Sequence, residues 1–184
     1  MNRRLATVFV PAVATLVATL VTTGAQAQQA ISPSAGEIVR KLAPADGPVK
    51  RGLGKRGVTV EGQQEDPKPP SIDLAVNFEY ASAKLTPDAR ITLDNLGQAL
   101  GDPQLRDSRF RIAGHTDARG GDAYNLTLSR QRAQAVADYL GQQHGVKPAR
   151  LQVEGYGRAQ LADPANPESV VNRRVQVVNL GAAN

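Results

Sequence analysis

Residues 114–133 read GHTDARGGDAYNLTLSRQRA and join a predicted strand to a predicted helix. On a helical wheel, Ala133 and Val136 mark the face that turns toward a core, and Arg132 falls within the same sector near the start of the helix. An unpaired guanidinium in that position is costly, so Arg132 must either reach solvent or meet an anion. Asp117 is the candidate partner, because the end of a strand and the start of the next helix lie at the same edge of a sheet.

Two interpretations of this pair follow from the residues. The spacing alone favours a structural salt bridge between Asp117 and Arg132. The alternative is a receptor for a zwitterion, in which the acid takes an ammonium and the arginine takes a carboxylate through a two-point fork. The intervening loop contains adjacent glycines and Asn125, and it offers exposed amides near a helix N-terminus, where anions bind.

A compact domain is predicted over residues 71–184. Alternating or continuous apolar runs predict strands, and apolar residues at helical spacing between capping and turn signals predict helices. The predicted strands cover 72–80, 108–116, 150–157 and 172–180, and the predicted helices cover about 86–100 and 126–143. The order strand, helix, strand, helix, strand, strand predicts one sheet covered by helices.

Residues 1–27 have the pattern of a signal peptide. Arg3 and Arg4 precede an uncharged apolar run over residues 5–24, and the small-residue sequence AQA ends at Ala27. The alternative is a retained anchor, since the run is about long enough to span a bilayer. We expect cleavage after Ala27 and export of the remaining chain.

Residues 28–70 are predicted to hold one short helix and a linker. Ser34 and Glu37 have the capping-box spacing before a short apolar pattern, and the following stretch is rich in proline and glycine. Within it, the basic run KRGLGKR at residues 50–56 is either a solvated tether or a contact for an anionic surface, such as lipid headgroups or cell-wall polymer. The sequence does not indicate what the short helix packs against.

The composition argues against several classes of function. The chain has no cysteine and only two histidines, and it lacks the spacing of a metal site or of a nucleophile elbow. We therefore expect no metal, no cofactor and no catalytic residue, and we expect His115 to be a packing or hydrogen-bonding residue and not a proton-transfer group. The net charge of +5 could suit nucleic acid, but an aromatic content of 4% argues against a stacking platform, and so does export.

The motifs resemble a known family. The ordered segments GHTDARGGDAYNLTLSRQRAQAVADYL, GV-x3-RLQVEGYG and NRRV are similar to the peptidoglycan-binding domain at the C-terminus of OmpA, over about residues 71–180. The same domain occurs in peptidoglycan-associated lipoproteins and flagellar stator proteins. The resemblance implies an α/β (α+β) sandwich, with a βαβαββ mixed four-stranded sheet and helices on one side.

The resemblance also implies a ligand and the residues that bind it. The expected ligand is the meso-diaminopimelate side chain of the peptidoglycan stem peptide, bound without covalent chemistry. Asp117 takes the position of the family's key acid and Arg132 that of its key arginine, while Thr116, Asn125 and Arg173 take supporting positions. A non-catalytic wall anchor is implied, located in the periplasm with possible outer-membrane association. If residues 1–27 are retained, the alternative is a stator-like tether in the inner membrane.

Two departures from the family pattern bear on binding strength. The family often has Asp or Asn in the turn after the first strand, in a run like FDFDSAxL, whereas this chain has FEYASAKL with Ala81 at that place. Near the end of the domain, GRAxNRRV is common, whereas this chain reads ESVVNRRV with Ser169 in place of an arginine. We expect binding to persist but to be weaker.

Overall fold

The computed structural model describes residues 32–44 and 68–182. The predicted signal peptide and the basic run at 50–56 lie outside these residues. Within the part that is described, no helix has both the length and the apolar character needed to cross a membrane.

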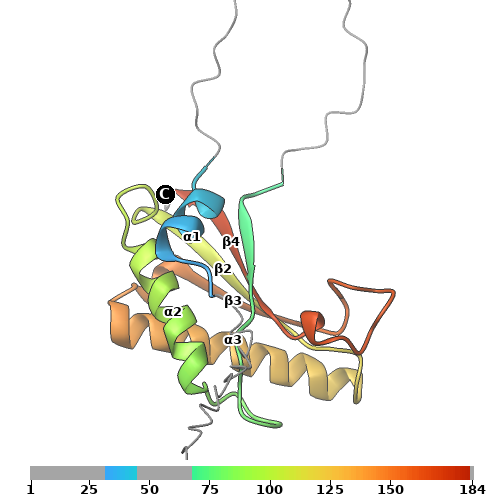
Figure 1. Cartoon of the computed structure of the whole chain (residues 1–184). Helices are drawn as coiled ribbons and strands as arrows, with labels where there is room; N and C mark the ends of the chain where they lie inside the picture. Colours follow the sequence, from blue (N-terminus) through green and yellow to red (C-terminus); the bar gives the residue numbers. More distant parts are fainter. Residues whose placement is uncertain (1–31, 45–67, 183–184) are drawn as a thin grey trace, which may run out of the picture. The chain divides into compact units, whose positions relative to one another are not determined.

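Four strands form one mixed sheet (Figure 1). They are β1 (Ser71–Leu74), β2 (Ser108–His115), β3 (Leu151–Gly157) and β4 (Val175–Ala182), and their order across the sheet is β1-β4-β2-β3. The pair β2–β3 is parallel, whereas β4 runs antiparallel to both β1 and β2. The parallel pair needs a crossover, which α3 supplies, and the predicted mixed four-stranded sheet is confirmed.

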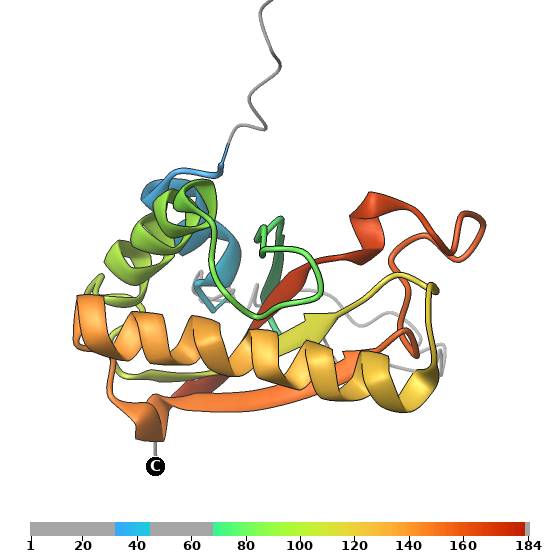
Figure 2. The ribbon, with the colours of Figure 1, turned by 90° about the horizontal axis from the view of Figure 1, so that it is seen from below.

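Three helices cover one face of this sheet: α1 (Ala35–Leu42), α2 (Pro87–Leu100) and α3 (Asp122–His144) (Figure 2). Two single 3-10 turns, Pro148–Arg150 and Val170–Asn172, precede β3 and β4. Because side chains alternate along a strand, every second side chain points toward the helices, and these apolar side chains form one core with them. The core residues that the strands supply are Ile72, Leu74, Phe110, Ile112, Val175 and Val177.

The first predicted strand is too long. Its alternation is correct, since Ile72, Leu74 and Val76 are all buried, but β1 ends at Leu74. Leu74 pairs with Val175, the first residue of β4, so the chain beyond Leu74 has no neighbouring strand to pair with. It continues instead to a single bridge between Phe78 and Leu85 and a turn before α2.

The predicted start of the second helix, near residue 126, is also wrong. Helix α3 begins at Asp122 with Gly121 as its N-cap, so Asn125 lies in the first turn of the helix and not in the loop. The added turn, residues 122–125, is exposed apart from Asn125 and carries no buried apolar residue, so apolar periodicity does not mark it. A tertiary contact, the ion pair between Arg158 and Asp122, holds this turn.

Helix α1 packs into the core, which the sequence gives no means of predicting. Its capping box at Ser34 and Glu37 is confirmed, and Ile38 and Leu42 are fully buried. The side-chain amide of Asn179 on β4 donates to the Leu42 carbonyl at 2.8 Å. Residues 32–44 are therefore fixed to the sheet and to α2 by apolar and polar contacts.

Two glycines allow α3 to lie directly on the sheet. A Cβ atom on Gly114 of β2 would lie 2.1 Å from the carbonyl oxygen of Ser129, and one on Gly155 of β3 would lie 2.5 Å from the backbone nitrogen of Arg130. The Ser129 hydroxyl accepts a hydrogen bond from the Gly157 amide at 2.9 Å and donates to the Leu126 carbonyl at 2.9 Å. Helix and sheet are thus joined at Ser129 by backbone contact and a buried hydroxyl.

The face of the sheet opposite the helices carries polar side chains around His115. His115 is 2% exposed, and neither ring nitrogen has a hydrogen-bond partner among the described residues. Its ring lies 5.4 Å from that of Tyr156, and the neighbouring Arg174 pairs with Asp73 at 3.3 Å. Burial, with a smaller contribution from Arg174, lowers the pKa of His115 from 6.5 to about 4, and Asp73 opposes the shift.

Replacement of Gly114 tests the contact between α3 and the sheet. We expect Gly114→Ala to destabilise the fold by about 3 kcal/mol or more, because the new methyl group meets helix backbone, which cannot move aside alone. Urea unfolding measures the change. The matched control is Gly36→Ala, where the Cβ meets nothing within 4 Å, and which should be neutral or stabilising by about 1 kcal/mol. Equal effects of the two substitutions would contradict the role given to Gly114.

The buried His115 predicts a pH-dependent stability. Between pH 6.5 and about 4 the unfolded chain binds a proton at this residue that the folded chain does not. The free energy of unfolding should therefore fall as the pH drops through this window, by up to about 3 kcal/mol. Chemical unfolding at pH 7, 5.5 and 4.5 measures the slope, and His115→Gln should have a shallower one. If the free energy of unfolding has the same pH dependence in both proteins, His115 contributes nothing to that dependence.

Candidate functional site

The residues predicted to bind a ligand lie where β2 ends and β4 begins. Asp117 lies two residues after the end of β2, and Arg173 lies two residues before the start of β4. The two strands are antiparallel, so the end of one and the start of the other meet, as the hydrogen bond from the His115 amide to the Arg174 carbonyl shows. Arg132 lies on α3, one helical turn beyond the contact at Ser129.

Asp117 is buried, and its ion-pair partner is Arg173. Its Oδ2 atom accepts a hydrogen bond from Nη1 of Arg173 at 2.9 Å, and its Oδ1 atom accepts one from the Arg119 amide at 3.2 Å. Among the described residues, no ion pair joins Asp117 to Arg132. The direct salt bridge that the spacing favoured is therefore not formed, and the carboxylate is paired with an arginine 56 residues away.

Arg132 is partly buried, and it has no carboxylate partner within the part of the chain that the structure describes. Its Nε donates to the Ser82 carbonyl at 3.0 Å, and its Cζ lies 5.0 Å from the centre of the Phe78 ring. Burial lowers its pKa. Tyr124 and Asp117 raise the pKa and Arg173 lowers it, so these groups lie within electrostatic range of Arg132. A guanidinium that is desolvated but not neutralised favours the approach of an anion.

The supporting residues differ in what they contact. Thr116 is 3% exposed; its backbone amide donates to Gly157, but its hydroxyl has no partner among the described residues. Asn125 is also buried, and its side-chain amide donates to the Arg119 carbonyl at 2.8 Å. Asn125 thus fixes the loop after Asp117, whereas the Thr116 hydroxyl is buried without a partner among the described residues.

Asn172 is a site-organising residue that the sequence reasoning missed. It is fully buried, and its side chain accepts from the Asp163 amide and donates to the Asp163, Asn166 and Pro167 carbonyls. These hydrogen bonds fix the conformation of the loop that leads into Arg173. Its position as the first residue of NRRV was the available signal, but periodicity says nothing about a side chain that bonds to a loop.

Phe78 and Ser82, the contacts of Arg132, also could not be found from spacing. Both belong to the irregular stretch that replaces the end of the predicted first strand. In this stretch Ala81 has a φ of 48°, the left-handed region that asparagine and aspartate tolerate better than alanine. An asparagine or aspartate at this position would therefore fit the backbone better than alanine does.

A second polar cluster joins α2 to α3. Asp94 Oδ1 lies 2.8 Å from Nε2 of His144 and accepts from the Tyr139 hydroxyl at 2.9 Å, and these two bonds lower the pKa of Asp94. The His144 ring lies against Gly97, where a Cβ would be 2.2 Å from the ring. Among the described residues, no serine, threonine or cysteine joins these bonds, and we interpret the cluster as a structural link between the two helices. In the described residues, no group of three or more potential metal ligands occurs.

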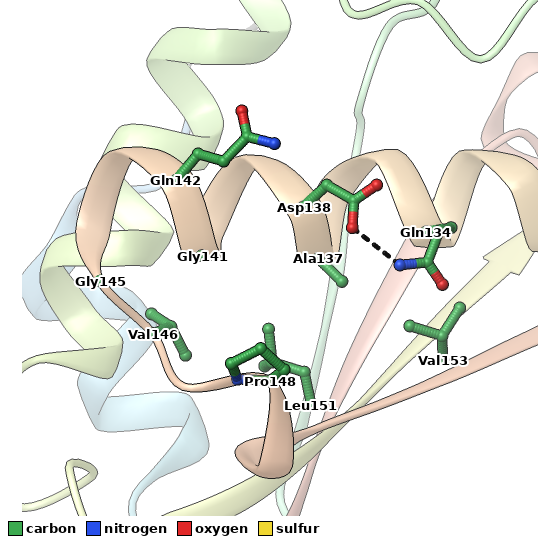
Figure 3. A pocket seen from close by; sticks show the side chains of 10 residues that line it. All are labelled: Gln134, Ala137, Asp138, Gly141, Gln142, Gly145, Val146, Pro148, Leu151 and Val153. Atoms are coloured by element: carbon green, nitrogen blue, oxygen red, sulfur yellow. Dashed lines mark hydrogen bonds between the residues drawn. The ribbon is translucent and has the colours of Figure 1, made fainter.

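A cavity of about 540 Å³ lies at the far end of α3 (Figure 3). Its helix side carries Gln134, Asp138 and Gln142, and Gln134 donates to Asp138 at 2.8 Å. The facing side is apolar and comes from residues 146–153. Gln134, the lining residue nearest to Asn125 along the helix, lies about 14 Å from it, given a rise of 1.5 Å per residue. None of the predicted ligand-binding residues lines this cavity.

Comparisons with known proteins agree on one family. The OmpA family model matches residues 77–174. The peptidoglycan-associated lipoprotein of Pseudomonas aeruginosa is 36% identical over 128 residues, which are 68% of this chain and 74% of that protein. Outer membrane porin F of the same species is 36% identical over 107 residues, 57% of this chain, and the chain spans 30% of the porin's length.

Solved structures show the same fold. The OmpA-like domain of FopA1 from Francisella tularensis aligns with a TM-score of 0.50 and 26% identity, over 62% of this chain and 77% of that domain. The periplasmic domain of Helicobacter pylori MotB aligns with a TM-score of 0.54 at 22% identity, over 66% of this chain and 88% of that one. With the mixed sheet, the matched motifs and the family model in agreement, the chain belongs to the OmpA family.

Proposed function

We propose that this protein binds peptidoglycan without covalent chemistry, through the meso-diaminopimelate side chain of the stem peptide. That side chain ends in an ammonium and a carboxylate on one carbon. Asp117 takes the ammonium and Arg132 takes the carboxylate, while Thr116, Asn125 and Arg173 support them. The name of the similar peptidoglycan-associated lipoprotein supports the polymer, and the charges of the site support the zwitterion.

The observation that carries the proposal is the charge on Arg132. Its guanidinium is held by the Ser82 carbonyl and the Phe78 ring, neither of which neutralises it. The buried carboxylate of Asp117 acts on the same guanidinium without touching it. The two side chains lie within electrostatic range of each other without forming an ion pair. This arrangement suits a ligand that carries an ammonium and a carboxylate close together.

The expected affinity is modest. Each charge-assisted hydrogen bond contributes about 1.5–3 kcal/mol net, so a few of them give a micromolar-class site of roughly −8 kcal/mol. Many stem peptides in one polymer add avidity, because each wall fragment offers repeated ligands. Weak individual contacts of this kind suit an anchor that stays attached to the wall without being locked to one strand.

In the cell, the proposal implies an exported protein that anchors the envelope. We expect the chain to be located in the periplasm on the wall, with possible association with the outer membrane, the location named for porin F. We expect no catalysis at the site, because its groups are suited to holding charge and none is an activated nucleophile.

Removal of either charge tests the site. We expect Asp117→Asn and Arg132→Gln each to weaken binding to a soluble diaminopimelate-containing muropeptide by tenfold or more, because each loses charge-assisted bonds. Isothermal titration calorimetry measures the loss, and co-sedimentation with diaminopimelate-type sacculi measures wall binding. The matched control is Arg130→Gln, an exposed arginine on the same helix. If the folded double variant of Asp117 and Arg132 still sediments with the wall like the parent, the proposed function is wrong.

The turn at Ala81 gives a separate prediction. Since this residue has a φ of 48°, Ala81→Asn should raise the free energy of unfolding by about 0.5–1 kcal/mol, whereas the β-branched Ala81→Val should lower it. Thermal unfolding measures both. The turn also places the Ser82 carbonyl against Arg132, so we expect muropeptide affinity to rise or hold with Asn and to fall with Val. The same sign of stability change for both variants would contradict this account.

A further inference from the structure

We propose that Arg173 is a specificity-determining residue, which rejects ligands that carry an ammonium alone and admits those that carry an ammonium beside a carboxylate. The inference rests on the proposed function, since it concerns the same site. It assigns Arg173 a selective role beyond support of the bound ligand. The structural basis is the contact between Arg173 and the carboxylate that the ammonium must reach.

Arg173 competes with a ligand ammonium for Asp117. Both carboxylate oxygens are engaged, one by Nη1 of Arg173 at 2.9 Å and the other by the Arg119 amide at 3.2 Å. The Asp117 side chain is only 10% exposed, so few directions of approach remain open. An arriving ammonium must therefore share the carboxylate with Arg173 or displace it.

The two arginines of the site differ in freedom. Arg132 is fixed by the Ser82 carbonyl and the Phe78 ring. The Arg173 side chain is 42% exposed, and among the described residues its only side-chain hydrogen bond is to Asp117. The Arg173 side chain is thus able to move away from Asp117 and bind a ligand anion, whereas the Arg132 side chain keeps its position.

The formal charges of the site explain why it would prefer a zwitterion to an ammonium alone. Asp117, Arg132 and Arg173 together carry a formal charge of one positive unit. The nearby arginines Arg119 and Arg158 are each paired with an acid, Glu168 and Asp122. A ligand that adds only an ammonium raises the positive charge of the site and leaves Arg173 without an anion. A ligand that adds both groups leaves the charge unchanged and offers Arg173 a carboxylate.

The ligand pair that tests this differs by one carboxylate. Two synthetic stem tetrapeptides, L-Ala-γ-D-Glu-X-D-Ala, carry either meso-diaminopimelate or L-lysine as X, so that the side chain ends in a zwitterion or in an ammonium. Calorimetry gives the affinity of the full-length protein for each peptide. We expect the parent protein to prefer the diaminopimelate peptide by about tenfold or more, the equivalent of one charge-assisted bond.

Replacement of Arg173 should reduce this preference. In Arg173→Gln, the lysine peptide no longer displaces a cation, so we expect the ratio of the two affinities to fall at least about fivefold. Arg173→Lys keeps the charge and should retain most of the preference, and Arg130→Gln should leave the ratio unchanged. Thermal unfolding checks that each variant is folded. If Arg173→Gln is unstable, the Arg173→Lys protein at low and high salt gives a second test, because screening should narrow its preference.

The outcomes separate the two proposals. An unchanged ratio in folded Arg173→Gln overturns the role of Arg173 and leaves the proposed function intact. Equal binding of both peptides by the parent overturns the role of Arg173 and also the assignment of the ligand carboxylate to Arg132. Failure of the parent to bind the diaminopimelate peptide overturns the proposed function and this inference with it. A lower ratio in Arg173→Gln with a retained ratio in Arg173→Lys supports the inference.

Discussion

The contact of α3 with the sheet at Ser129 is the constraint on which the rest of the structure depends. Gly114 and Gly155 lie side by side on the parallel strands β2 and β3, and neither has room for a Cβ atom beneath the helix. The backbones of helix and sheet therefore approach more closely than side chains usually allow. The buried Ser129 hydroxyl adds a hydrogen bond from the Gly157 amide, so the helix is fixed in height and in position along the strands.

The site follows from this fixed contact. Asn125 lies one turn before Ser129 and Arg132 one turn after it, so the helix carries one residue to the loop after β2 and the other to the turn around Ser82. Asp117 comes three residues after Gly114, close to the same contact. The relative positions of Asp117 and Arg132 are thus set by rigid elements, while the exposed side chain of Arg173 retains freedom to move.

The sequence predicted the regular elements well where local signals were strong. Capping residues such as Thr86 and Ser34 and the apolar periodicity located the helices, and alternation identified the strand residues that face the core. It failed where tertiary contacts decide. The strand from residue 72 ends early because β4 begins at Val175 and offers no earlier residue to pair with. Helix α3 begins at Asp122, before the predicted start, with an exposed first turn that carries no buried apolar residue. The packing of α1 had no local signal at all.

For the candidate site, the sequence by itself determined that Arg132 lies in the core-facing sector of its helix, because the helical period fixes the direction of a side chain. It also supplied the motif that led to the OmpA family. Only the tertiary structure decided that Asp117 pairs with Arg173 and not with Arg132. Strand β4 arrives antiparallel beside β2, and the Asn172 side chain shapes the loop before it. No local pattern encodes a meeting between residues 56 positions apart, because it depends on strand register and loop shape.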